Sequence, residues 1–264
     1  MVVADLHVHT TNSDGTLTLE TLPEAAQAAS VDAVAVTDHD RLHPGLDGPV
    51  VERDGVTVVH GIELRVEPEE GERVDLLGYG VEPTDALAAE VERIQRDRVE
   101  RGRAIVEGLE DHLGVSLDVA VEPGLGRPDV ARAVADHPDT DYGYEETFDE
   151  LIGDGDPFFV SRDVPSFERG VELLREACSL VGLAHPMRYD DPEAALELAA
   201  DLDAVELHYP YGREVDATQV EQAIREYDLL PTGGTDAHEE TLGVTGLDAA
   251  EYEQFRSALE RTTD

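Results

Sequence analysis

The sequence predicts an α/β fold built around a parallel β-sheet, either open or closed. Two observations support this prediction. Short apolar runs alternate with stretches of helical apolar spacing, as they do in chains built from strand-helix units. Histidines and carboxylates recur directly after the apolar runs, where the parallel strands of a barrel end at one common rim. The chain has 264 residues and is 41% hydrophobic, so it can bury a sizeable core.

Apolar runs in the first part of the chain predict strands separated by one clear helix. The run at 32–37 (DAVAVT) is typical of a buried strand, and Pro23 suits the first turn of a helix because it has no N–H to donate. The expected elements are strands at 2–6, 32–37, 56–63 and 74–79 and a helix at 18–29.

The middle of the chain interrupts this rhythm with helices alone. A long charged helix is expected at 85–113, with shorter helices at 127–135 and 145–152. We therefore predict a helical insertion, or cap, at 83–155 within a main domain formed by 1–82 and 156–264.

Strands and helices alternate again in the last part of the chain. Apolar runs predict strands at 180–184, 204–207 and 229–232, and helical spacing predicts helices at 166–179, 192–200, 215–227 and 248–259.

The charge of the chain is extreme, with 61 acidic and 19 basic residues and a net charge of −42. Such a chain is expected to repel long nucleic acids and anionic membranes. An acidic disordered protein is one interpretation, but the apolar periodicity argues against it. We favour a cytoplasmic protein of a halophile, since high internal salt screens self-repulsion. No secretory signal or membrane span is recognisable, and the single cysteine, Cys178, excludes an internal disulfide.

Metal-competent side chains gather at the predicted strand ends. Alternate residues of an extended segment point the same way, so His7 and His9 can share an ion, and Asp236 and His238 repeat that spacing. Imidazole and carboxylate donors without thiolate suit Zn, Mn or Fe(II). The donors exceed one tetrahedral site, so two or three divalent ions are expected. The candidate ligands at these strand ends are His7, His9, His39, Glu63, Asp75, His185, Asp236 and His238.

Each of these short signals also has an ordinary structural explanation, such as a turn aspartate or a loop histidine, and only their agreement favours a metal site. For the other histidines, at 43, 60, 112 and 137, the structural explanation is preferred. His208 stays open between a substrate contact and packing at the rim. Asp5 and Asp40 are expected to orient ligand histidines from behind.

Arg127 and Arg162 flank the predicted insertion and are candidates for binding a phosphate, because a guanidinium binds phosphate in a bidentate manner. An ion pair with one of the many carboxylates is the competing explanation for each.

Taken together, the motifs resemble those of the PHP (polymerase and histidinol phosphatase) family. The similar segments are 5–10 with 13–16, 37–40, 61–63, 184–186 and 234–238, and segments 76–79, 126–128 and 153–155 are similar to its stand-alone branch. The resemblance implies a distorted (β/α)7, TIM-like barrel with up to three ions. It assigns His7, His9, Glu63 and Asp236 to one ion, Glu63, residue 75 and His185 to a second, and Asp14, His39 and His238 to a third. Asp75 and Asp129 stand where the family usually has histidine.

The resemblance implies a metal-dependent phosphoesterase that acts on a phosphomonoester or terminal phosphodiester. Nucleoside 3′,5′-bisphosphate or short RNA is the expected substrate, attacked by a hydroxide between the ions. Arg127 or Arg162 would orient this substrate, and His185 or His208 would protonate the leaving oxygen. Histidinol-phosphate phosphatase is one alternative, and a non-catalytic metal-binding regulatory module is another. The sequence does not predict the oligomeric state.

Overall fold

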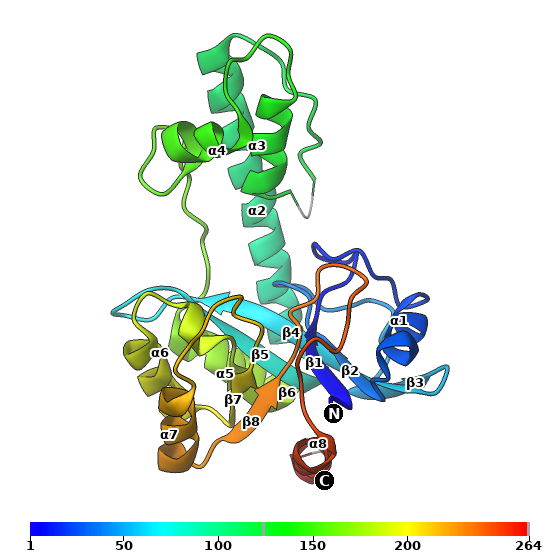
Figure 1. Cartoon of the computed structure of the whole chain (residues 1–264). Helices are drawn as coiled ribbons and strands as arrows, with labels where there is room; N and C mark the ends of the chain where they lie inside the picture. The colour runs from blue at the N-terminus through cyan, green and yellow to red at the C-terminus, as the bar shows by residue number, and fades with distance from the viewer. Residues whose placement is uncertain (123–124, 263–264) are drawn as a thin grey trace. The chain divides into compact units, whose positions relative to one another are not determined.

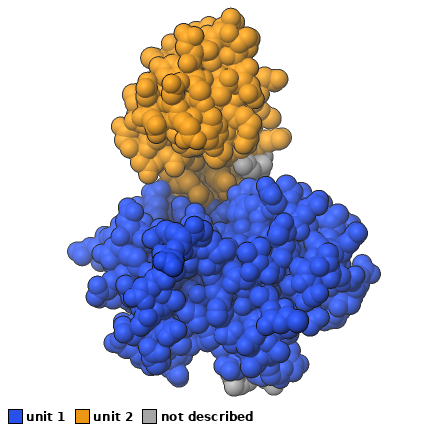
Figure 2. All heavy atoms as spheres, in the orientation of Figure 1, with its two compact units in different colours: residues 1–91, 164–264 blue, residues 92–163 orange. Residues whose placement is uncertain are grey.

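A computed structural model describes residues 1–122 and 125–262 of the chain. The contacts divide the chain into unit 1, residues 1–91 and 164–264, and unit 2, residues 92–163 (Figure 2). These boundaries differ from the predicted insertion at 83–155 because helix α2 (Asp85–Leu113) passes from one unit to the other without a break.

Unit 1 is built on one eight-stranded sheet (Figure 1). The strands follow the order β1-β2-β4-β5-β6-β7-β8, and β3 pairs with β4. Their bounds are β1 (Ala4–Val8), β2 (Ala33–Val36), β3 (Val50–Arg53), β4 (Val56–Val66), β5 (Val74–Val81), β6 (Cys178–Leu183), β7 (Ala204–His208) and β8 (Leu230–Gly233).

The sheet is mixed, so the expectation of a parallel sheet was wrong for β5. Strand β5 runs antiparallel to both β4 and β6, whereas the pairs β1–β2, β2–β4, β6–β7 and β7–β8 are parallel. The reason lies in the segment 67–73, which joins β4 directly to β5 and has no helix with which to make a parallel crossover. The first residues of β5 therefore lie beside the last residues of β4, and Asp75 is paired with Arg65.

The sheet nearly closes on itself. Strand β1 bonds with the segment after β8, because His9 N donates to Ala237 O at 2.9 Å and Ala237 N donates to His7 O at 3.2 Å. The predicted distorted, TIM-like barrel with surrounding helices is confirmed.

The helices of unit 1 bury one apolar stripe each. Phe255 of α8 contacts the ring of Tyr79 edge-on, at 5.2 Å between centroids, inside the core lined by β1, β2, β4, β5 and β6. Leu22 and Ala26 of α1 pack on the other side of β2. The bounds are α1 (Leu22–Ala29), α5 (Phe167–Ala177), α6 (Pro192–Leu198), α7 (Thr218–Tyr227) and α8 (Ala249–Thr262), with 3-10 turns η2 (Pro186–Arg188) and η3 (Ala199–Asp201).

Unit 2 has a core of its own, to which α2, α3 (Arg127–Ala135) and the π-helical turn η1 (Phe148–Ile152) contribute, and the short helix α4 (Tyr144–Thr147) directly precedes η1. The last two elements replace the single helix expected at 145–152. Among the described residues, no helix combines the length and the apolar character that crossing a membrane requires.

Candidate metal centre

The first ligand group lies at the end of β1 and contains His7, His9, Glu63 and Asp236. His9 Nε2 is 3.0 Å from Asp236 Oδ1 and 3.4 Å from Glu63 Oε2. His7 Nε2 is 3.4 Å from the same Glu63 oxygen. The pairing of β1 with β2 shifts register between Asp5 and Val8, an irregularity of the kind that turns a side chain toward a site. Two imidazoles and two carboxylates therefore converge on one point inside the barrel rim.

A second group contains Glu63, Asp75 and His185. His185 Nε2 lies 3.0 Å from Glu63 Oε1 and 3.7 Å from Asp75 Oδ2. Glu63 thus faces the first group through Oε2 and the second through Oε1, as a bridging carboxylate does. Asp75 also accepts a hydrogen bond from Arg65 Nε at 2.7 Å, so this ligand candidate already has a cationic partner.

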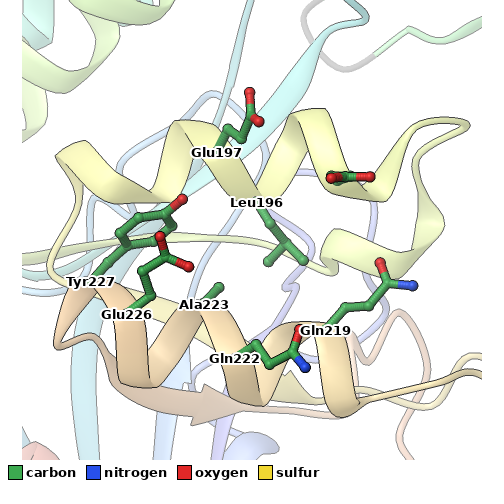
Figure 3. A pocket seen from close by; sticks show the side chains of 8 residues that line it. Leu196, Glu197, Gln219, Gln222, Ala223, Glu226 and Tyr227 are labelled. Carbon is green, nitrogen blue, oxygen red and sulfur yellow. The ribbon is translucent and has the colours of Figure 1, made fainter.

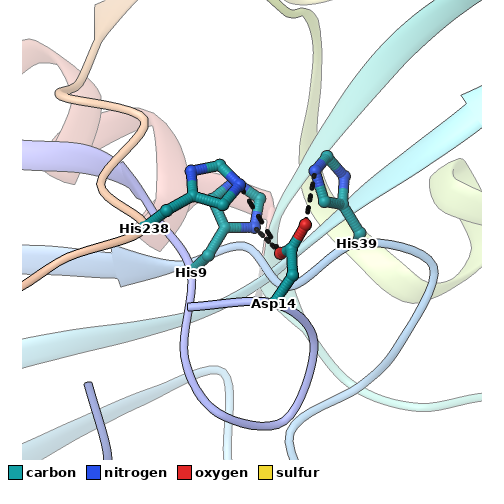
Figure 4. A group of neighbouring side chains, drawn as sticks. All are labelled: His9, Asp14, His39 and His238. Carbon is teal, nitrogen blue, oxygen red and sulfur yellow. Dashed lines mark ion pairs between the residues drawn. The ribbon is translucent and has the colours of Figure 1, made fainter. Parts of the chain in front are cut away.

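The third group, drawn in Figure 4, contains His9, Asp14, His39 and His238. Asp14 lies between the imidazoles: Oδ1 is 3.5 Å from His238 Nε2 and 3.8 Å from His9 Nδ1, and Oδ2 is 3.8 Å from His39 Nε2. His9 enters the first group through Nε2 and the third through Nδ1. The three groups are consequently one continuous cluster with shared members.

Several buried polar atoms in this cluster have no hydrogen-bond partner among the described residues. They are His7 Nε2, both ring nitrogens of His9, Glu63 Oε2, His185 Nδ1 and Asp236 Oδ1. Leaving a buried polar atom without a partner costs about 1–3 kcal/mol. Within each group the ligand atoms all lie within 4.8 Å of one another. The orphaned atoms and the imidazole–carboxylate chemistry both fit bound divalent cations.

Electrostatics favour the ionised form of two carboxylates of the cluster, Glu63 and Asp14. Burial raises the pKa of Glu63, but the neighbouring His39 and His7 outweigh burial and bring that pKa well below its ordinary value. Burial likewise opposes ionisation of Asp14, and its hydrogen bond with His238 lowers its pKa. Burial lowers the pKa of His39, yet the Glu63 carboxylate raises it to about 9. A site with this charge pattern attracts cations.

Asp38 is buried and holds the turn that carries Asp14. It accepts hydrogen bonds from Thr10 N at 2.7 Å and from Ser13 Oγ at 2.8 Å. The third ligand group therefore depends on a carboxylate outside it.

Asp5 and Asp40 likewise accept hydrogen bonds from backbone N–H groups, at two other places. Asp5 accepts from Thr235 N and Gly243 N, both at 2.8 Å, and so fixes the loop after β8. Asp40 Oδ1 accepts from Arg65 N at 3.1 Å. Both carboxylates accept hydrogen bonds from the backbone of segments near the ligands, and their expected role in orienting ligand histidines stays a prediction.

Three residues beside the ligands were not predicted from the sequence: Glu206, Arg188 and Tyr209. Glu206 is fully buried on β7 and lies 3.2 Å from His7 Nδ1. Tyr209 OH donates to Asp236 Oδ2 at 2.7 Å, and Arg188 Nη1 donates to Tyr209 OH at 2.9 Å. A lone carboxylate inside the apolar run of β7 was the available signal for Glu206.

The predicted substrate-handling residues are divided between the two units. His185 belongs to the second ligand group, and the Nε2 of His208 lies 2.8 Å from Glu251 Oε1 on α8. Arg127 and Arg162 lie in unit 2, where Arg127 Nη1 donates to Asp154 Oδ1 at 2.7 Å.

A separate hollow of about 420 Å³ lies between α6 and α7 (Figure 3). Its charged lining consists of Glu193, Glu197 and Glu226, which would repel a phosphate. The metal cluster is the better candidate for the functional site.

Known proteins of similar sequence indicate the class to which this chain belongs. The PHP domain profile matches residues 5–152. A phosphoribosyl 1,2-cyclic phosphate 1,2-diphosphodiesterase of Eggerthella lenta is 30% identical over 90% of this chain and 94% of its own length. A 3′,5′-nucleoside bisphosphate phosphatase of Chromobacterium violaceum is 30% identical over 75% and 71%, and the 5′-3′ exoribonuclease Rnm of Salmonella typhimurium is 28% identical over 90% and 86%.

Solved structures share the fold. One from Bifidobacterium adolescentis, described as a metal-dependent phosphoesterase, has a TM-score of 0.72 at 21% identity and covers 97% of this chain and 96% of that one. An amidohydrolase structure from Chromobacterium violaceum has a TM-score of 0.73 at 23% identity and covers 97% of both chains. The family match and these relatives show that the chain is a metal-dependent phosphoesterase, a hydrolase. The chain belongs to the PHP domain family.

Proposed function

We propose that the protein hydrolyses a phosphomonoester or a terminal phosphodiester on a small nucleotide-like substrate, such as a nucleoside 3′,5′-bisphosphate or a short RNA. The observation that carries this proposal is the continuous cluster in which Glu63 and His9 are each shared by two ligand groups. Adjacent cations suit a phosphoryl group, whose oxygens carry charge that must be neutralised. Relatives that act on a bisphosphate and on RNA support the substrate class.

The residues of the rim have distinct tasks in this proposal. Bound ions, two or three in number and Mn, Zn or Fe in kind, supply an activated water and charge neutralisation. All nine predicted ligands hold these ions. His185 or His208 protonates the leaving oxygen; Nδ1 of His208 is the atom to do so, because Nε2 is engaged by Glu251.

Arginines orient the substrate phosphate. Arg127 and Arg162 remain our proposals in unit 2. In unit 1 the structure adds Arg188, whose side chain is 54% exposed and whose Nη1 lies 3.3 Å from Asp236 Oδ2. A half-exposed guanidinium beside a ligand carboxylate is placed to bind a phosphate oxygen. We further propose a cytoplasmic location, in keeping with a single buried cysteine.

The test is phosphate release at high salt, with Mn²⁺ and with chelator. The panel contains adenosine 3′,5′-bisphosphate, a 5′-phosphorylated trinucleotide, phosphoribosyl 1,2-cyclic phosphate and histidinol phosphate. Chelator-sensitive turnover of the bisphosphate or the trinucleotide is the expected result, and the trinucleotide reaction is followed by the mononucleotide it releases.

The other outcomes have defined meanings. Turnover of the cyclic phosphate alone would assign the chain the activity named for its Eggerthella lenta relative. Turnover of histidinol phosphate alone would replace the nucleotide proposal with a biosynthetic one. Metal binding without turnover of any compound would contradict the proposed substrate class and favour a regulatory metal-binding module.

A further inference from the structure

Glu206 is a buried carboxylate in an apolar strand. It lies on β7 between Val205 and Leu207 with 0% of its surface exposed. Burying a carboxylate is costly unless hydrogen bonds and opposite charges compensate. The register of β7 against β8 shifts between Glu206 and His208, so the strand is irregular at this side chain. A carboxyl group buried at such a position is expected to have a specific function.

The first contact of Glu206 is with a ligand histidine. Its Oε1 and Oε2 lie 3.2 and 3.4 Å from His7 Nδ1. In this contact the carboxylate oxygens of Glu206 accept and the ring nitrogen donates, so His7 Nδ1 carries the proton. In a neutral imidazole this leaves the lone pair on Nε2, the atom that lies 3.4 Å from Glu63 Oε2 and 3.5 Å from Asp236 Oδ1. Glu206 therefore selects the His7 tautomer whose free nitrogen points into the first group.

The second contact is with the backbone of another ligand. His185 N donates to Glu206 Oε2 at 2.7 Å. His185 has φ +29°, a left-handed backbone conformation that residues other than glycine rarely adopt. The hydrogen bond helps to hold this conformation, in which His185 Nε2 lies 3.0 Å from Glu63 Oε1. One carboxylate thus contacts a member of the first group and a member of the second.

We propose that Glu206 is the positioning residue of the metal centre, fixing the tautomer of His7 and the backbone of His185 so that both imidazoles face Glu63. Glu206 itself belongs to none of the three ligand groups found among the described residues. Its role is to orient ligands of two groups, through its contacts with His7 of the first group and His185 of the second. This inference rests on the metal centre and is independent of which phosphate ester is the substrate.

Replacing Glu206 with glutamine separates this role from simple packing. A glutamine amide offers one oxygen and one NH₂ group. The backbone N–H of His185 can only donate, so it keeps the oxygen, and the NH₂ group faces His7 Nδ1. That nitrogen must then accept, which moves the ring proton to Nε2 and blocks its lone pair. The substitution changes hardly any volume, yet it reverses the nitrogen that His7 presents to a metal.

The experiment compares Glu206→Gln with Asp203→Asn in the full chain, using Mn²⁺ without substrate. Asp203 is the matched control, because its carboxylate also accepts a backbone hydrogen bond, from Val181 N at 3.0 Å, just before the start of β7. Competition with a chelating dye measures Mn²⁺ affinity, and the melting temperature is recorded in chelator and in Mn²⁺. For Glu206→Gln the expected result is a Kd raised roughly 10- to 100-fold and a smaller increase in Tm on adding Mn²⁺. Asp203→Asn is expected to match the wild type in both.

Two results would overturn the proposal. One is wild-type Mn²⁺ affinity in Glu206→Gln. The other is a lower Tm in chelator with an unchanged increase on adding Mn²⁺, which would indicate a purely structural role. If Glu206→Gln fails to fold, Glu206→Asp tests the proposal instead. It keeps the carboxyl group, but its shorter side chain does not reach both His7 Nδ1 and His185 N. An intermediate loss of Mn²⁺ affinity is expected for Glu206→Asp, and wild-type affinity would contradict the proposal.

Discussion

At the scale of single residues, three of the six non-glycine residues with positive φ in the described part of the chain lie at or beside the metal cluster. Asp40, His185 and Asp236 have φ values of 49°, 29° and 53°, in the left-handed region. Such conformations cost of order 1–3 kcal/mol each and persist where the surroundings hold them in place. Two of the three are predicted ligands, and the hydrogen bond from His185 N to Glu206 is one of the contacts that compensate the strain.

His9 is the residue whose loss should disturb the centre most, because it belongs to two ligand groups. We expect His9→Ala to lower kcat by roughly 100-fold or more, the equivalent of about 3 kcal/mol of lost charge stabilisation. Steady-state kinetics at saturating Mn²⁺ would measure this loss. His112→Ala, at an exposed histidine of α2, is the control, and Asp236→Ala should behave like His9→Ala. Retained turnover in both site variants would contradict the assigned centre.

Arg188 should act on substrate binding more than on the folded state. Removing its guanidinium in Arg188→Ala is expected to raise KM about 10-fold, the worth of one charge-assisted hydrogen bond. Arg127→Ala and Arg162→Ala, measured in parallel, test the two proposals in unit 2. If KM changes only in those two variants, the phosphate contact lies with unit 2 and the role given to Arg188 is wrong.

His60 predicts a pH dependence of stability that is separate from the metal centre. Burial lowers its pKa to about 4, and neither ring nitrogen has a hydrogen-bond partner among the described residues. The unfolded chain binds a proton near the ordinary pKa of about 6.5, while the folded chain resists it. This contribution is therefore fully present above pH 6.5 and is lost as the pH falls toward 4.

The measurable consequence is a difference between wild type and His60→Leu. Between pH 7 and pH 5 the wild type should lose about 2 kcal/mol more of its free energy of unfolding than His60→Leu does. Urea unfolding in the presence of chelator, at both pH values, measures the difference. Parallel losses in the two proteins would show that the His60 ring titrates normally.

At the scale of elements, the turn at 10–15 depends on Asp38. Replacing it in Asp38→Ala leaves Thr10 N and Ser13 Oγ without their acceptor, at a cost of about 1–3 kcal/mol for each buried group. We expect the third ligand group to lose Asp14 from its place while the first two groups remain. Elemental analysis after gel filtration should then find about one Mn²⁺ fewer per chain than in the wild type. An unchanged metal content would show that the turn keeps its shape without this carboxylate.

Most elements could be predicted from the sequence because their apolar pattern is local. Helix α3 was predicted at its observed bounds, 127–135. Strand β3 was not predicted, because Val50–Arg53 is short, partly exposed and defined by pairing with β4. The direction of β5 also depends on a pairing that no local pattern records.

The same division applies to the site. Eight of the nine ligand candidates follow from residue type and position and Asp14 from the family resemblance, and the structure brings all nine into the three groups. The contacts that hold those ligands come from distant segments: Glu206 is 199 residues from the ligand His7, and Asp5 is 230 residues from Thr235, which precedes the ligand Asp236. Which carboxylate meets which ligand depends on the closing of the barrel, so these contacts could not be inferred beforehand.

At the scale of the whole molecule, the net charge of −42 should govern stability. Self-repulsion destabilises a compact state of such charge, and salt screens it. We expect the Tm in chelator to rise steadily between 0.1 and 2 M KCl. Choline chloride at matched ionic strength is the control for specific K⁺ binding. A Tm independent of salt would mean that the acidic residues are neutralised within the fold.

The hairpin of β4 and β5 has a consequence for the order in which the ligands come together during folding. Glu63 and Asp75 are joined by a short loop, so little chain entropy opposes their approach, whereas His7 and Asp236 lie at opposite ends of the sequence. The hairpin is expected to form early and the junction between β1 and the segment after β8 to form last. A bound ion that needs both ends of the chain would then stabilise the native state more than the transition state. Metal should accordingly slow unfolding and leave the rate of refolding nearly unchanged.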